Sequence, residues 1–172
     1  MIKKLVSITV VLFILCSYSF AENRSFSIDG KYNAYFPEKP KFLAELGQGS
    51  KRHRSYVYTD EENLIIYTAT YQAGITRFAK KDVPKALENY VKGQALSVGG
   101  KVKSYKANSI GSNESAIFSV IYKYENVEIR KFGVLSYKGG RFYQWSVQNF
   151  PALSKLDGKT LFYNHLNQFS VK

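Results

Sequence analysis

Residues 52–58 combine two side-chain types that bind anions and sugars. Arg52, Arg54, Tyr56 and Tyr58 occupy alternate positions, and residues two apart in an extended strand share one face. Guanidinium groups beside phenols can hold an anionic or carbohydrate ligand by bidentate hydrogen bonds and stacking. His53, on the opposite face, completes the set of candidate ligand-binding residues. The alternative, which the sequence favours, is that the tyrosines are core aromatics and the arginines line the rim of the sheet.

Residues that could carry out catalysis are sparse. His53 lies in a Lys-Arg-His-Arg run and His165 on the apolar stripe of a predicted helix, and neither has a catalytic partner nearby in sequence. The sequence contains no H-E-x-x-H or G-x-S-x-G motif and no phosphate-cradling glycine loop. Acidic residues are few and fall mostly in turns, which gives paired-carboxylate chemistry little support. We therefore predict no enzyme activity, no catalytic residue, no metal site and no cofactor; an enzyme of unknown type is the third alternative.

The first 21 residues have the three parts of a secretory signal. Two lysines precede an apolar run from Leu5 to Leu15, and small residues stand at the positions that precede cleavage after Ala21. This run is shorter than the roughly 20 residues of a membrane-spanning helix. We predict a signal peptide over residues 1–21 and a single α/β domain over residues 22–172, in the periplasm or secreted, with no stable membrane span after cleavage.

Cys16, the only cysteine, lies within this signal. Lipidation at Cys16 is the less favoured alternative, because Leu15 stands where a lipoprotein signal needs a small residue. Once the signal is removed, the chain has no thiol. Cysteine nucleophiles, thiolate metal sites and thiol redox chemistry are therefore excluded.

The elements that must position the candidate residues begin with an aromatic-rich extended segment from Phe26 to Phe36, which turns at Asp29-Gly30. Pro37 and Pro40 end it, because proline has no amide hydrogen for a sheet. The next strands, 50–59 and 64–72, form a predicted hairpin around a polar turn at residues 60–63.

Two helices are predicted, one in the middle of the chain and one at its end. Asp82 can cap the first, whose apolar residues follow helical spacing and which ends at Gly99-Gly100. Asp157 can cap the second, from Gly158 to about Phe169. The apolar stripe of the first helix comprises Val83, Leu87, Tyr90, Val91, Ala95 and Val98.

A predicted strand at 101–110 is followed by a three-stranded meander from Ser115 to Gln148, with turns at Glu125-Asn126 and Gly139-Gly140. Its strands are apolar on both faces, whereas a sheet with one face in water would alternate apolar and polar residues. Helices should therefore cover both faces. This indicates an α+β fold in which an antiparallel β-sheet of six to seven strands lies between helices, with Tyr143 and Trp145 in the core.

The formal charge is +12, and removal of Lys3 and Lys4 with the signal lowers it to +10. In an exported protein this excess favours an anionic partner such as acidic lipid, an envelope polymer or an acidic protein. The alternative is that dispersed lysines only keep the protein soluble. The export signal argues against nucleic acid. Arg130, Lys131 and Arg141, near the ends of the meander, either contribute to binding or blunt edge pairing.

Five segments, taken in this order of elements, are typical of one known fold: Phe36-Pro37-Glu38-Lys39-Pro40, Lys85-Ala86-Leu87-Glu88-Asn89-Tyr90, Gly99-Gly100-Lys101-Val102, Arg141-Phe142-Tyr143-Gln144-Trp145 and Asn167-Gln168-Phe169-Ser170-Val171. On these segments the chain resembles the PsbP-like fold, which includes the extrinsic oxygen-evolving protein of photosystem II and exported bacterial proteins, many without a known role. The resemblance implies an antiparallel sheet between helices, and a binding or assembly factor rather than a catalyst. No metal or calcium ligand set of the plant protein can be placed on this sequence.

Together these observations predict an exported, non-catalytic envelope binding or assembly factor with an unknown protein partner. The alternative is a binder of anionic envelope lipid or polymer that uses the basic, tyrosine-rich strand.

Overall fold

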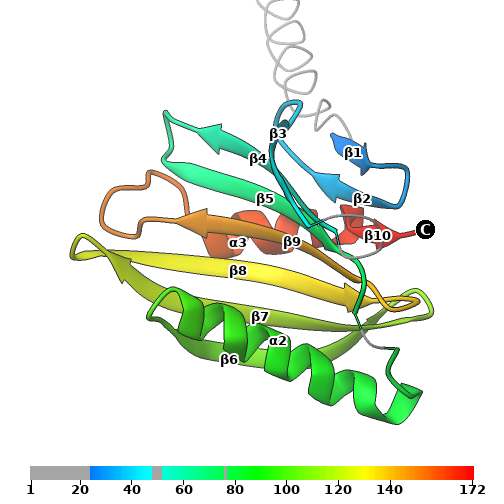
Figure 1. The fold of residues 1–172 in the computed structure, drawn as a ribbon. Coiled ribbons are helices and arrows are strands. Elements are labelled where there is room, and N and C mark those ends of the chain that lie inside the picture. The colour runs from blue at the N-terminus through cyan, green and yellow to red at the C-terminus, as the bar shows by residue number, and fades with distance from the viewer. Residues whose placement is uncertain (1–23, 48–51, 76) are drawn as a thin grey trace, which may run out of the picture.

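The computed structural model describes residues 24–47, 52–75 and 77–172. The predicted signal peptide, Ser50 and Lys51 lie outside these residues. Within them, seven strands form one antiparallel sheet in the order β3-β4-β5-β9-β8-β7-β6 (Figure 1). These strands are β3 (Lys41–Leu46), β4 (His53–Asp60), β5 (Ile65–Gln72), β6 (Lys101–Ile110), β7 (Asn113–Tyr124), β8 (Val127–Tyr137) and β9 (Phe142–Asn149). The predicted α+β class and the predicted size of the sheet are confirmed.

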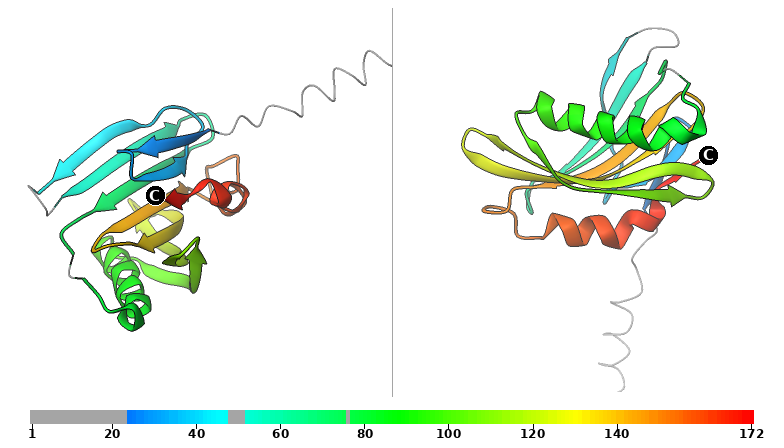
Figure 2. Two further views of the ribbon diagram at one scale, coloured as in Figure 1. Left: turned by 90° about the vertical axis from the view of Figure 1, so that its right-hand side faces the viewer. Right: turned by 90° about the horizontal axis from the view of Figure 1, so that it is seen from below.

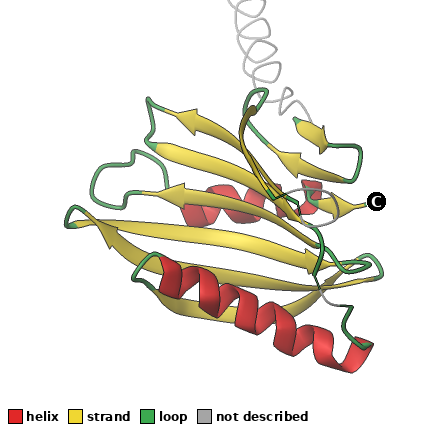
Figure 3. Ribbon diagram, viewed as in Figure 1, coloured by secondary structure: helices red, strands yellow, loops and turns green. Residues whose placement is uncertain are grey.

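A layer of structure covers each face of the large sheet (Figures 2 and 3). Helix α2 (Val83–Ser97) packs on β6, β7 and β8. On the opposite face, α3 (Gly158–His165) packs on β8 and β9 and continues into a 3-10 turn, η2 (Leu166–Gln168). A second sheet, in the order β1-β2-β10, shares this side; its strands are β1 (Ser25–Ile28), β2 (Tyr32–Tyr35) and β10 (Ser170–Val171). The predicted cover by the C-terminal helix alone is therefore incomplete.

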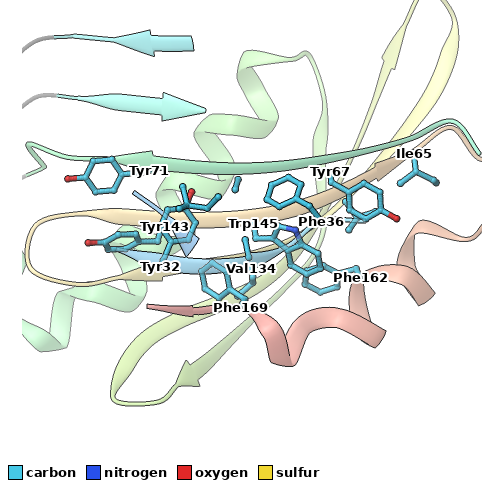
Figure 4. Close-up of a cluster of buried hydrophobic side chains, with 14 residues drawn as sticks. Tyr32, Phe36, Ile65, Tyr67, Tyr71, Val134, Tyr143, Trp145, Phe162 and Phe169 are labelled. Carbon is cyan, nitrogen blue, oxygen red and sulfur yellow. The ribbon is translucent and has the colours of Figure 1, made fainter. Parts of the chain in front are cut away.

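The predicted meander is formed by β7, β8 and β9, and β9 lies at the centre of the large sheet. Both predicted turns are present, and each has two successive residues with positive φ, as tight hairpin turns with the twist of the sheet require. Trp145 on β9 is fully buried and stacks on Phe162 of α3, with ring centroids 5.3 Å apart. Its indole N–H donates to the Tyr35 carbonyl oxygen at 2.8 Å. Figure 4 shows this aromatic core, and the predicted core position of Trp145 is confirmed.

The N-terminal region differs from the prediction in two ways. The predicted turn at Asp29-Gly30 is present, but it reverses the chain (φ 51° and 66°), so the segment predicted as one extended run is a hairpin of β1 and β2. Strand β3 was not predicted. Its side chains are mostly exposed, so it lacks the alternation that marks a half-buried strand, and its pairing with β4 defines it.

The helix ends also differ in detail. Helix α2 follows Asp82, but the Asp82 side chain makes no capping hydrogen bond; a 3-10 turn, η1 (Lys80–Asp82), precedes the helix. Val98 was predicted in the buried stripe but is 44% exposed, because α2 ends at Ser97. Asp157 caps α3 as predicted and accepts from the Lys159 and Thr160 amides. This helix ends at His165, earlier than predicted, before η2.

Candidate anion-binding site

Two of the predicted binding residues, Arg54 and Tyr56, are held by carboxylates. The Arg54 guanidinium donates from Nη1 to Oδ2 of Asp29 at 3.0 Å and from Nε to Oε2 of Glu45 at 3.1 Å. The Tyr56 hydroxyl donates to Oδ1 of Asp29 at 2.6 Å. Burial and this hydrogen bond raise the pKa of Tyr56 to about 12. Because carboxylates already occupy both groups, these contacts agree with the structural role for Arg54 and Tyr56 that the sequence favours over ligand binding.

Tyr58 and His53 take no part in these carboxylate contacts. Tyr58 packs against Tyr67, with ring centroids 6.1 Å apart, and joins the aromatic core. His53 projects from the other face, where its Nε2 lies 3.1 Å from the Ser55 hydroxyl oxygen, and burial lowers the pKa of its imidazole. The structure therefore does not bring all five predicted residues into one site.

Arg52, which precedes β4, lines a pocket of about 380 Å³ at one end of the sheet. Three other cations line the same pocket: Lys31 from the β1–β2 turn, Arg77 from the segment after β5 and Arg141 from the β8–β9 hairpin. We call it the basic pocket. The Lys31 ammonium sits 4.3 Å from the centroid of the Tyr71 ring, a cation–π contact in the pocket lining.

Hydrogen bonds join the β8–β9 hairpin to the segment after β5 beside the basic pocket. The Tyr137 hydroxyl accepts from the Phe78 amide at 3.1 Å and from the Gly140 amide at 3.2 Å. The Ile75 amide donates to the Gly140 carbonyl oxygen at 3.3 Å. Gly140 has φ 75°, and a Cβ there would lie 3.2 Å from the Ile75 carbonyl oxygen. The close approach of these two segments requires a glycine at position 140 and brings the elements that carry Arg77 and Arg141 together.

The electrostatics of the basic pocket favour anions. Of the ten described residues that line it, four are cationic and none is acidic. Glu45 does not line the pocket, but its Oε1 lies 3.6 Å from Nε of Arg52. The Arg52 side chain is nevertheless 46% exposed. Arginine pairs bidentately with phosphate and carboxylate groups, and lysine adds a point charge. The arrangement suits an oxyanion ligand, and its volume falls at the small end of ligand pockets.

Of these four cations, sequence reasoning named Arg52 as a binding candidate, left Arg141 open between binding and edge protection, and missed Lys31 and Arg77. Lys31, Arg77 and Arg141 are isolated in sequence and come from three different connections. The available signal was their position at turns: Lys31 follows Gly30, and Arg141 follows Gly139-Gly140. Turn residues converge only when the strands they connect are ordered in space, so the pattern alone could not assemble the pocket.

The second histidine has a structural environment. The His165 ring stacks on Tyr35 with centroids 3.5 Å apart and an interplanar angle of 4°. Its Nδ1 lies 3.3 Å from the Gln168 side-chain amide nitrogen. Among the described residues, no group of three or more His, Cys, Asp or Glu side chains is placed to hold a metal ion. Within the same residues, no helix has the length and apolar character needed to cross a bilayer.

Comparison with known proteins gives a structural match. No protein-family model matches the sequence, and no curated protein matches it. The structure is similar to the solution structure of cyanobacterial PsbP (CyanoP) from Synechocystis sp. PCC 6803, with a TM-score of 0.56 over 86% of this chain and 91% of that chain. The fold is PsbP-like. At 12% sequence identity, this match shows a shared architecture and does not assign a function to this chain.

Proposed function

We propose that this protein is an exported, non-catalytic binding factor, periplasmic or secreted, that holds an anionic envelope component in the basic pocket. The observation that carries the proposal is the convergence of Lys31, Arg52, Arg77 and Arg141 on one pocket without an acidic lining residue. The signal-like residues 1–21 support export. The PsbP-like fold is compatible with an accessory role and does not assign one.

The ligand class follows from the chemistry of the four cations. Phosphate and carboxylate oxygens accept paired hydrogen bonds from a guanidinium, and the pocket offers three guanidinium groups and one ammonium. An acidic lipid headgroup and an acidic envelope polymer both present such oxygens. The sequence placed this binding on the strand face that carries Arg52, Arg54, Tyr56 and Tyr58. The geometry favours the neighbouring pocket, which Arg52 alone of these four residues lines.

The first test is binding of pyrophosphate to the folded protein, followed by calorimetry and by NMR shifts. Arg77→Gln combined with Arg141→Gln should weaken binding by at least about tenfold, because two charge-assisted contacts are lost. The matched control, Lys106→Gln with Lys155→Gln, removes the same charge from exposed positions outside the pocket lining. It should bind like the wild type. Equal losses in the two variants would show that only net charge matters and would contradict a pocket.

The second test separates the two sources of the anion. Vesicles with an anionic headgroup, vesicles of zwitterionic lipid and a soluble anionic polymer are compared at several salt concentrations. Binding to an anionic form should weaken steeply as salt rises. Salt-independent binding, or a substrate turnover that is lost in His53→Ala or His165→Ala, would contradict the proposal.

A further inference from the structure

Strand β3 is an apolar edge of the large sheet. It pairs with β4 on one side, and among the described residues no strand pairs with its other side. Phe42, Leu43 and Leu46 are 55%, 63% and 66% exposed, which places three large apolar side chains in a six-residue edge strand. Unpaired backbone groups beside apolar side chains are a template for another strand.

The opposite edge, β6, carries an excess of like charge that β3 lacks. Lys101, Lys103 and Lys106 are exposed along β6, and β6 carries no acidic residue. Lysines on an edge strand repel a second copy of the same edge and resist pairing. Strand β3 carries one lysine, Lys41, and one acid, Glu45, so its two formal charges cancel. The two edges of one sheet therefore differ in both apolar exposure and charge.

We propose that β3 is a self-association surface, on which β3 of a second copy pairs antiparallel about a two-fold axis. Such pairing joins the two seven-stranded sheets and covers the apolar side chains of both edges. A second copy fits because antiparallel pairing brings Lys41 of one protomer towards the end of the strand that carries Glu45 in the other. The Glu45 carboxylate is already fixed at this edge by Arg54.

The shape of β3 sets limits on this interface. The register with β4 shifts between Phe42 and Ala44, so Leu43 is the extra residue of a bulge. Bulges twist an edge and shorten the length that can pair, so the contact is short and the dimer dissociates on dilution. The association stops at two copies, because β6 carries its lysines at the only other edge of the large sheet in the described structure.

Sedimentation velocity of the mature chain from about 1 µM to about 0.5 mM tests the proposal. We expect a reversible monomer–dimer equilibrium without larger species. Leu43→Lys places on β3 the charge that β6 already has, and it should raise the dissociation constant by at least about tenfold. Leu96→Lys, at a 75% exposed leucine on α2, is the matched control and should leave the equilibrium unchanged.

Hydrogen exchange on the same samples locates the contact. Backbone amides of β3 should become protected as protein concentration rises, and amides of β6 should not. A monomer at every concentration, a Leu43→Lys dimer as tight as the wild type, or a dimer with unprotected β3 amides would each overturn the proposal. No anion is present in these measurements, so their outcome is independent of the basic pocket.

Discussion

Arg52 and Arg54 are two residues apart, and their surroundings differ sharply. The Arg54 side chain is 25% exposed and contacts Asp29 and Glu45 at 3.0 and 3.1 Å. The Arg52 side chain is 46% exposed, and its contact with Glu45 is longer, at 3.6 Å. Arg54 thus fastens the β1–β2 turn to the sheet, whereas Arg52 lines an open pocket. Two alternate positions of one predicted strand therefore have separate structural roles.

The β1–β2 turn contributes to the different surroundings of the two arginines, because it places one charged residue near Arg54 and another in the pocket that Arg52 lines. Asp29 binds Arg54 and Tyr56, and Lys31, two residues later, enters the lining of the basic pocket. The positive φ angles of Asp29 and Gly30 reverse the chain between these two side chains. The turn therefore places a negative charge beside Arg54 and a positive charge in the basic pocket. The net charge of the chain does not reveal this difference.

The largest expected difference between the surroundings of Arg54 and those of Arg52 is in their contribution to the stability of the fold. Asp29→Asn keeps a residue that tolerates positive φ, so its cost reports the lost ionic contacts with Arg54 and Tyr56. We expect a loss of about 2 kcal/mol in the free energy of unfolding, measured by urea denaturation. Arg52→Gln should cost less than about 0.5 kcal/mol, because its side chain is more exposed. Equal costs for the two substitutions would remove the distinction.

The pH dependence of this contribution has a defined sign. Burial raises the pKa of Asp29, but hydrogen bonds from Tyr56 and Arg54 and the charges of Arg54 and Lys31 outweigh burial, so the pKa lies below its usual value. The stabilisation from Asp29 is therefore fully present above the unfolded-state pKa of about 4 and is lost as the pH falls through the folded-state value.

The measurement is the difference in unfolding free energy between the wild type and Asp29→Asn from about pH 7 down to about pH 2.5. The difference should be constant at the upper end and shrink below about pH 4. A difference that stays constant across the whole range would show that the Asp29 charge does not contribute.

The smallest expected effect concerns Glu45, which touches both arginines. Glu45→Gln removes the negative charge nearest to Arg52 and should raise pyrophosphate affinity about two- to threefold, the scale of one exposed ion pair. Calorimetry at constant ionic strength measures this gain. Glu62→Gln is the control, because Glu62 pairs with Lys155 and lies outside the pocket lining. Equal affinities in the wild type and both variants would mean that Glu45 does not attenuate Arg52.

Sequence patterns predicted the parts of the fold in which burial is periodic. The two-sided apolar strands from Ser115 to Gln148 indicated cover on both faces, which α2 and α3 provide together with the small sheet. The hairpin of β4 and β5 and the Asp157 cap follow from local turn and capping chemistry. Strand β3 escaped prediction because its side chains are exposed, so no periodicity marks it.

The sequence by itself determined the α+β class, the antiparallel meander and the placement of Trp145 in the core, because these depend on local periodicity and on the burial of apolar side chains. The sequence also identified Arg52 and Arg54 as basic residues on one face of a predicted strand. Only the tertiary structure decided which of these cations meet carboxylates and which line a pocket. Charge pairing joins residues from separate connections, such as Lys31, Arg77 and Arg141, and their meeting depends on the order of strands in space.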